Sequence, residues 1–234
     1  MKLTPESTDE IKKVKKIQSR FLSGMDAENK GYRIEACSGR RGCPNLANES
    51  ASLFKQIEEL LAQKDLVGFL RRNVKGSIKF HHEFRVTLAD CPNSCSQPQI
   101  KDIGIIGAVI PAITEESCSL CEECVAVCKD KAIRISNLKA RPEINTDLCL
   151  MCGLCVKACP TGAISEGERG FRVQIGGKLG RRPRLARELP GIYNEADVLN
   201  IINRCIEYYL THSKDGQRFA EIIEGVEINQ NLYR

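Results

Sequence analysis

The sequence predicts an α+β protein in which a small cysteine-rich domain interrupts a larger domain, whose mixed or antiparallel sheet is covered by helices. Three observations support this prediction. Stretches with strand character and amphipathic helical stretches occur together on both sides of a central segment. That segment, between Thr114 and Glu168, contains eight of the 13 cysteines. It is also acidic, with nine acidic and six basic residues, whereas basic residues prevail after Gly170.

The composition is that of an ordinary globular protein. The 234 residues are 42% hydrophobic and 28% charged, which excludes disorder over the whole chain. The longest nearly apolar run, Ile103 to Ile113, is shorter than the ~20 residues that span a bilayer, so we expect no membrane segment. Residues 1–10 contain no apolar signal-peptide core, so we expect a cytoplasmic protein. A net charge of +5 does not by itself indicate nucleic-acid binding, and we expect none.

Helices and strands are predicted together before the cysteine-rich segment. Residues 1–30 contain a lysine-rich amphipathic stretch, which predicts a helix, and Tyr32–Ala36 is a short strand candidate. In Asn48–Gln63 the large apolar residues recur with helical spacing, which predicts a helix with one buried face. The alternation in Phe80–Leu88 predicts a strand, and the apolar run Ile103–Ile110 predicts a buried one.

Two further elements are predicted after the cysteine-rich segment. Arg172–Ile175 is expected to add a strand to the sheet. A strong amphipathic helix is expected from Asn194 to Leu210, with Asn194 as its N-cap and Asp197 three residues on. Its apolar face is predicted to consist of Val198, Ile201, Ile202, Cys205, Ile206 and Tyr209.

The cysteine content indicates metal binding rather than disulfides. Thirteen is an odd number, and the N-terminal residues carry no export signal. Disulfide scaffolds are typically short, secreted and even in cysteine number, whereas clustered thiols in a reducing compartment more often hold metal.

The central segment contains the spacing C-x2-C-x2-C-x3-C twice, from Cys118 to Cys128 and from Cys149 to Cys159. This is the bacterial two-cluster ferredoxin pattern, in which the fourth cysteine of each run binds the cluster of the other run. We therefore predict two 4Fe–4S clusters. One is assigned to Cys118, Cys121, Cys124 and Cys159, and the other to Cys128, Cys149, Cys152 and Cys155. Zinc is the alternative, but zinc ribbons use two C-x2-C pairs separated by a longer gap, which fits two identical four-cysteine runs poorly.

The repeat divides the chain into three stretches. Residues 1–112 are predicted to form the first part of the larger domain, 113–169 the inserted ferredoxin-like domain, and 170–234 the second part of the larger domain. We expect the ends of the insert to lie close together, because the sheet of the larger domain continues across it.

Four more cysteines precede the insert, in the spacings C-x5-C and C-x3-C. Each spacing is a weak signal alone, because loops with two cysteines are common. Together with neighbouring motifs they resemble the cluster-binding half of the repeat of sirohaem-dependent sulfite and nitrite reductases. The resemblance covers most of residues 32–112 and 171–228, and the insert resembles that of the dissimilatory and anaerobic members. The matching residues are Cys37, Cys43, Asp90–Cys95, Asp102–Gly107, Gly176–Pro183 and Gly216–Phe219.

The resemblance implies a third 4Fe–4S cluster and sirohaem. Cys37, Cys43, Cys91 and Cys95 would hold this cluster, and Cys95 would be the thiolate shared with the haem iron. Sirohaem carries many carboxylates, which arginine forks bind well. The basic candidates in or beside the matched motifs are Arg33, Arg40, Arg41, Lys178, Arg181, Arg182 and Arg184. The simpler interpretation of Arg181, Arg182 and Arg184 is a solvated basic loop.

The resemblance further implies reduction of sulfite to sulfide, with nitrite as the second choice of substrate. Arg40, Arg41 and His82 are the candidates for contact with the small oxyanion, although the simpler interpretation of His82 is an ordinary strand residue. A low-potential donor, either a ferredoxin or a reductase subunit, would supply electrons through the two ferredoxin-type clusters.

A non-catalytic electron-transfer or auxiliary subunit of a larger redox complex is the alternative function. Only 36 residues precede Cys37, and they contain no Arg-x-Arg or Thr-Thr-Arg-Gln stretch of the kind that binds the substrate anion in the family. The C-x3-C motif and the following Asp102–Gly104 segment favour the enzyme. Members of the family pair two repeats and this chain has one, so we expect a homodimer or a hetero-oligomer.

Overall fold

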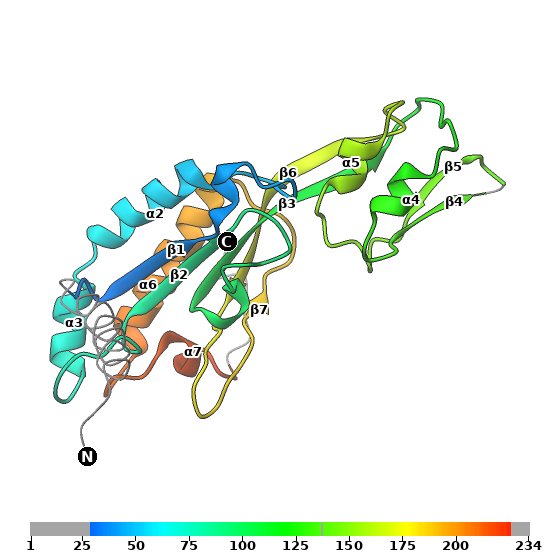
Figure 1. Ribbon diagram of the computed structural model, residues 1–234. Helices are drawn as coiled ribbons and strands as arrows, with labels where there is room; N and C mark the ends of the chain where they lie inside the picture. The colour runs from blue at the N-terminus through cyan, green and yellow to red at the C-terminus, as the bar shows by residue number, and fades with distance from the viewer. Residues whose placement is uncertain (1–28, 137, 226–234) are drawn as a thin grey trace, which may run out of the picture.

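A computed structural model describes residues 29–136 and 138–225 of the protein, so the helix predicted in residues 1–30 lies almost entirely outside the described part. The larger domain contains a five-stranded mixed sheet with the order β1-β2-β3-β6-β7 (Figure 1). The first three strands are parallel, and β6 and β7 run antiparallel to their neighbours. The strands are β1 (Tyr32–Ala36), β2 (Phe84–Ala89), β3 (Ile103–Ile113), β6 (Ile164–Ile175) and β7 (Arg187–Glu188).

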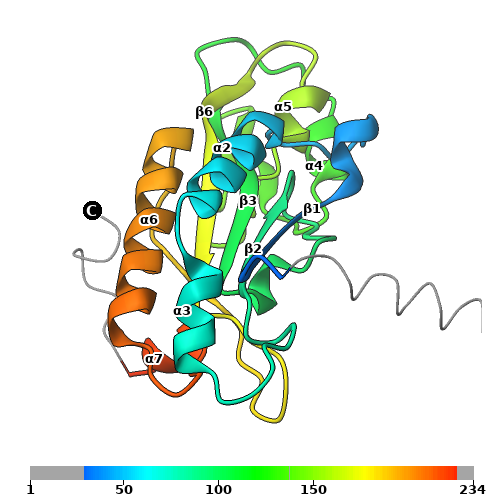
Figure 2. The same ribbon diagram turned by 90° about the vertical axis from the view of Figure 1, so that its left-hand side faces the viewer.

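Helices cover one face of this sheet, as Figure 2 shows for α2, α3 and α6. The helices of the larger domain are α2 (Ala51–Ala62), α3 (Leu66–Asn73), α6 (Glu195–His212) and α7 (Phe219–Ile222). Side chains alternate across a strand, and the residues that do not point toward the helices include Arg33, Arg85 and Arg172. The protein is therefore an α+β protein with one apolar and one polar sheet face. None of the helices in the described ranges has the length and apolar character that a membrane crossing requires.

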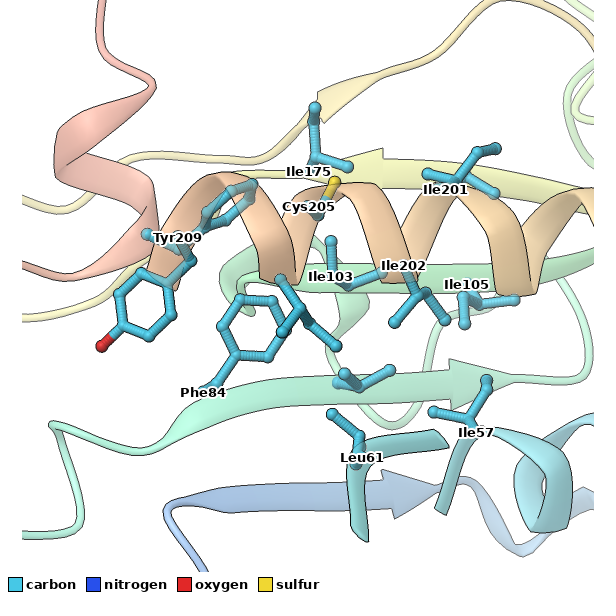
Figure 3. Close-up of a cluster of buried hydrophobic side chains, with 14 of the residues drawn as sticks. Ile57, Leu61, Phe84, Ile103, Ile105, Ile175, Ile201, Ile202, Cys205 and Tyr209 are labelled. Carbon is cyan, nitrogen blue, oxygen red and sulfur yellow. The ribbon is translucent and has the colours of Figure 1, made fainter. Parts of the chain in front are cut away.

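The core lies between α6 and the middle of the sheet (Figure 3). All six residues predicted for the apolar face of α6 are buried, and the predicted N-cap Asn194 accepts a hydrogen bond from Asp197 N at 2.9 Å. Cys205 is fully buried on this face, and burial raises the pKa of its thiol to about 12. This cysteine is therefore a small apolar core residue, as the helical pattern indicates.

One predicted strand is wrong at its beginning. β2 starts at Phe84 rather than Phe80, and Phe80–Glu83 form a turn in which the Phe80 side chain is 66% exposed. The strand can begin only where its neighbour begins, and Phe84 N donates to Gly31 O just before β1. The alternation at Phe80 and His82 therefore has no neighbouring strand to pair with.

The other predicted elements are present with different bounds. The strand Tyr32–Ala36 is confirmed, and the helix predicted from Asn48 begins at Ala51. β3 and β6 are both longer than predicted, and α3 was not predicted. The extra length of β3 and β6 matters most, because it forms the connection to the insert.

β3 and β6 pair along their whole length, from Ile103 with Ile175 to Ile113 with Ile164, with one irregularity beside Pro111. β2 ends level with Ile106, so the two strands continue as a ribbon beyond the rest of the sheet (Figure 1). The insert follows at the end of this ribbon, and its two chain ends are thus paired. It contains α4 (Glu123–Val127), β4 (Ile133–Ser136), β5 (Arg141–Ile144) and α5 (Leu154–Ala158).

Truncation of Ile202 to alanine should destabilise the protein by about 2–5 kcal/mol, because the side chain is fully buried between α6 and the sheet. Asn200→Ala, on the exposed side of the same helix, should cost less than about 0.5 kcal/mol. Denaturant unfolding measures both. Equal effects of the two substitutions would contradict the packing of α6 described here.

Candidate metal centres

The four cysteines of the larger domain meet at one edge of the sheet. β1 and β2 are parallel, so their carboxyl ends lie side by side, and Cys37 N donates to Leu88 O at 2.9 Å. The short helix η1 (Ser38–Arg41) leads from Cys37 to Cys43, and the turn after β2 carries Cys91 and Cys95. All four residues line a single cavity. The structure thus brings together two weak sequence signals that lie about 50 residues apart.

Buried polar contacts hold these two loops together. The buried Asp90 carboxylate accepts hydrogen bonds from Ser50 N and Ser50 Oγ, at 3.2 and 2.6 Å, and Asp90 O accepts from Ala47 N and Asn48 N. Gly39 lies so close that an added Cβ would be 2.9 Å from Asp90 Oδ2 and 3.2 Å from Cys37 Sγ. The loop that carries Cys43 is therefore fixed against the loop that carries Cys91.

Two hydrogen bonds point at the thiols of this set. Asp90 N donates to Cys37 Sγ at 3.3 Å, and the side-chain amide of Asn93 donates to Cys95 Sγ at 3.0 Å. Burial raises the pKa of the Cys91 thiol, and the neighbouring thiols of the set raise it further. Four thiolates gathered in one cavity require cations to neutralise them, which is what a bound metal cluster provides.

The insert contains two further cavities, each lined by one of the predicted four-cysteine sets. One is lined by Cys118, Cys121, Cys124 and Cys159, and the other by Cys128, Cys149, Cys152 and Cys155. Backbone N–H groups donate to the thiols here too, for example Ala132 N to Cys128 Sγ at 3.2 Å and Ile164 N to Cys159 Sγ at 3.4 Å. Burial, followed by the thiols of Cys152 and Cys149, raises the pKa of Cys155 to about 12.

The donor sets fit a cluster. In the described part of the chain, no three His, Cys, Asp or Glu side chains converge on a single metal ion. A 4Fe–4S cluster does not require such convergence, because its four thiolates surround a body of several irons. The fit therefore rests on the four cysteines around each of three cavities.

The two insert sites differ in their surroundings. Val109 of β3 forms a bridge with Cys152, and Val109 N donates to Met151 O at 2.8 Å. A cavity of about 160 Å³ lies between the two domains here and is lined by Cys91 and Asn93 on one side and Cys152 on the other. The Cys152 site therefore adjoins the larger domain's site. At the other insert site Cys121 and Leu120 are exposed.

The predicted basic residues are divided between internal contacts and solvent. The Lys178 side chain is only 9% exposed and pairs with Glu221 at 3.3 Å, while Arg184 donates to Gly176 O and Ala220 O. Arg181 and Arg182 are exposed. Arg33 is half-exposed on the polar sheet face and pairs with Glu83 at 3.2 Å.

The three predicted catalytic candidates do not lie together. Arg40 and Arg41 are in η1, which follows the carboxyl end of β1. His82 precedes the amino end of the parallel strand β2, where its Nδ1 accepts from Lys79 N at 3.0 Å. A strand of six residues spans about 20 Å, which separates His82 from η1. Burial, followed by the charges of His81 and Lys79, lowers the pKa of His82.

Sequence reasoning missed a buried charged group beside the polar sheet face. The Asp102 side chain is 2% exposed, and it accepts a hydrogen bond from Arg85 N at 2.9 Å and lies 3.9 Å from Arg218 Nη2. Among the described residues, Arg85 Nε, Arg218 Nε, Arg218 Nη2 and Asp102 Oδ1 are buried without hydrogen-bond partners. The free Asp102 oxygen faces Arg218 Nη2, so this buried carboxylate is balanced by the Arg218 guanidinium. Arg218 lies in a matched motif, so the resemblance could have indicated it.

Comparisons with known proteins agree with this arrangement. The family model described as "Nitrite and sulphite reductase 4Fe-4S domain" matches residues 28–230. The coenzyme F420-dependent sulfite reductase of Methanocaldococcus jannaschii is 32% identical over 211 residues, which are 84% of this chain and 32% of that protein. An uncharacterized protein of the same organism is 28% identical over 232 residues, 99% of this chain and 74% of that one. The chain thus spans about a third of the first relative and three quarters of the second.

A solved structure shares the fold. The dissimilatory sulfite reductase I structure has a TM-score of 0.54 and 16% identity, and the match covers 85% of this chain and 50% of that chain. At this identity the likeness concerns the fold alone. The family match, in contrast, extends over residues 28–230, a range that contains the sheet, the cysteines of all three cavities and Asp102. The chain therefore belongs to the nitrite and sulfite reductase 4Fe–4S domain family.

Proposed function

We propose that the chain is a sirohaem and 4Fe–4S oxidoreductase that reduces sulfite to sulfide, with nitrite as the second substrate. One observation carries the proposal: the cavity of Cys37, Cys43, Cys91 and Cys95 lies next to the insert site that contains Cys152. Neighbouring electron-carrying sites are what a many-electron reduction needs. The names of two relatives, the F420-dependent sulfite reductase and one component of the anaerobic sulfite reductase of Salmonella typhimurium, support the choice of sulfite.

Each cofactor has its own set of residues in this proposal. Cys37, Cys43, Cys91 and Cys95 would hold one cluster, and Cys95 would also hold the sirohaem. The two sets in the insert would hold the other clusters. When bound, the clusters supply single electrons at low potential, and the sirohaem supplies an open iron position for the substrate. The side-chain amide of Asn93 donates to Cys95 Sγ and orients it.

The cationic residues serve the acidic cofactor and the anionic substrate. Arg33, Arg85 and Arg218 lie around the polar sheet face and the buried Asp102, and we assign them to carboxylates. Arg40 and Arg41 follow Cys37 in η1 and are the candidates to stabilise the substrate's developing charge. His82 is left out, because it lies at the opposite end of β2 from the cysteines.

The proposed partners follow from the two exposed parts of the molecule. The Cys121 site, with its exposed thiol and Leu120, is where a donor such as a ferredoxin or a reductase subunit would deliver electrons. The helices α2, α3 and α6 leave the polar sheet face to the short helix η2 (Pro98–Ile100), whose Pro98 packs against Gly104 of β3. A second copy of the chain or a different subunit would cover the exposed remainder of this face and complete the substrate site.

A non-catalytic electron-transfer subunit is the second candidate function, and one observation favours it. Lys178 and Arg184, which the resemblance implies as sirohaem ligands, are engaged with Glu221 and with carbonyl oxygens near α7. These contacts hold the loop after β6 against α7 without any cofactor.

Iron analysis tests the number of clusters. After anaerobic reconstitution, the protein should contain about twelve non-haem irons and a similar amount of acid-labile sulfide, because each of the three cysteine sets holds four irons. About eight irons would mean that the larger domain's set is not a cluster site. A stable zinc protein without labile sulfide would rule out all three.

Substitution of Cys95 by serine should disturb both cofactors of the larger domain, because the thiolate is shared between them. Cys155→Ser should damage electron delivery through the insert and leave the haem spectrum unchanged. Cys205→Ser is the control, because this buried residue lies on α6 and outside all three cavities. The haem absorption band and the sulfite reduction rate with an artificial donor are measured for each. A normal haem band and full turnover in Cys95→Ser would contradict the shared site.

A further inference from the structure

The contact between the insert and the larger domain is small and specific. Val156 of α5 packs against an apolar group formed by Ala47, Cys91 and Val109. Gly153 has a φ of +69° just before α5, and an added Cβ would lie 2.9 Å from Val109 Cβ. We call this contact the seam. It joins the helix between Cys152 and Cys159 to the loops that carry Cys43 and Cys91.

Two cationic side chains bind the larger domain's loop at the seam: Lys157 binds it across the seam from α5, and Arg169 binds it from the β3–β6 ribbon, where it pairs with Val109. Lys157 of α5 donates from Nζ to Leu46 O at 2.5 Å, and Arg169 of β6 donates from Nη1 to Ala47 O. Both acceptors are backbone carbonyls of the loop that follows Cys43. A charged donor makes a stronger hydrogen bond to a carbonyl than a neutral donor does. Two cations therefore bind consecutive carbonyls of one loop.

The acceptor loop is fixed on its other side to the cysteine cavity. Leu46 N donates to Cys43 O at 3.2 Å, and Ala47 N donates to Asp90 O at 2.9 Å, next to Cys91. The Leu46 carbonyl thus faces α5 of the insert and the Ala47 carbonyl faces the β3–β6 ribbon, while their N–H groups donate to Cys43 O and Asp90 O. A displacement of Lys157 or Arg169 would therefore move the loop that follows Cys43, which is bound to Asp90 next to Cys91.

The two cations differ in how they are held. Arg169 is oriented by a double ion pair with Glu166, three residues before it on β6. Lys157 forms no ion pair with any residue in the described ranges, and its head group is directed to Leu46 O. Lys157 lies between two cysteines of the insert, Cys155 and Cys159, which belong to different cavities.

We propose that Lys157 and Arg169 are positioning residues that clamp the Cys152 site against the larger domain's site and so set the rate at which electrons cross the seam. The inference rests on the proposed function, in which both cysteine sets hold clusters. The step itself moves one electron: the cluster in the insert is oxidised and the cluster in the larger domain is reduced, with no bond made or broken. The clamp takes no part in this chemistry and acts only on the separation of the two sites.

The double variant Lys157→Met/Arg169→Met tests the clamp in the reconstituted full chain. Loss of these hydrogen bonds should favour opening of the seam by about tenfold. Hydrogen exchange of Val109 N, which donates across the seam to Met151 O, reports this opening directly. Magnetic coupling between the reduced clusters, seen by electron paramagnetic resonance, should weaken, and electron transfer across the seam after rapid mixing should slow.

The conservative variant Lys157→Arg/Arg169→Lys should restore exchange, coupling and transfer, because both charges remain. Lys139→Met is the matched control, since Lys139 lies on the exposed β4–β5 hairpin of the same insert and pairs only with Glu143 among the described residues. Iron content should equal that of the unaltered protein in all variants. Unchanged exchange, coupling and transfer in the double variant would overturn the clamp.

The outcomes also separate the clamp from the proposed function. If the clusters form but sulfite is not reduced, the proposed function fails, and the coupling and transfer rate still decide the clamp. If sulfite is reduced and the double variant transfers electrons as fast as the unaltered protein, the clamp fails and the function stands. If no clusters form, both the proposed function and the clamp are wrong.

Discussion

The pairing of β3 with β6 is the constraint on which the rest of the structure depends. At Ile103 and Ile175 these strands belong to the sheet of the larger domain, and at Ile113 and Ile164 they lead into the insert. One continuous set of backbone hydrogen bonds therefore serves both domains. It also places Val109, near the middle of β3, in contact with Cys91 and in a backbone bridge with Cys152 of the insert. The neighbouring positions of two cysteine cavities are a consequence of this ribbon.

The parallel pairing of β1 and β2 explains the position of the third cavity, which is lined by Cys37, Cys43, Cys91 and Cys95. Because β1 and β2 run in the same direction, the loops that follow them meet at one edge, and Asp90 joins these loops through Ser50. The same geometry places His82 at the far edge. Apolar residues of the sheet thus pack against α6, cysteines lie at its carboxyl edge, and arginines lie on the face opposite α6.

Local patterns in the sequence predicted what depends on local geometry. The cysteine spacings identified the sets that line the cavities, since three members of each insert set come from one short turn, and helical spacing identified the buried face of α6. The exchanged fourth cysteines, Cys128 and Cys159, follow from the known two-cluster pattern. The resemblance to a family paired the C-x5-C and C-x3-C motifs, which spacing alone could not do.

Features set by distant parts of the chain were not predictable from one segment. β2 begins at Phe84 because β1 begins opposite it, so the apolar alternation of Phe80 and His82 was misleading. The engagement of Lys178 with Glu221, and of Lys157 with Leu46 O, joins residues whose separation in the sequence exceeds 40 positions. A basic residue in a sequence does not reveal whether it binds a ligand or a carbonyl of its own chain.

An absorption spectrum of the anaerobically purified full chain tests most directly whether the larger domain is a sirohaem centre. The place of Cys95 in the four-cysteine cavity at the carboxyl edge of β2, together with the arginines on the sheet face opposite α6, predicts a Soret band and a chlorin-type band in the red. Both bands should shift when sulfite is added to the reduced protein. A broad iron–sulfur absorption without either band, persisting after reconstitution with sirohaem, would contradict the reductase and leave an electron carrier.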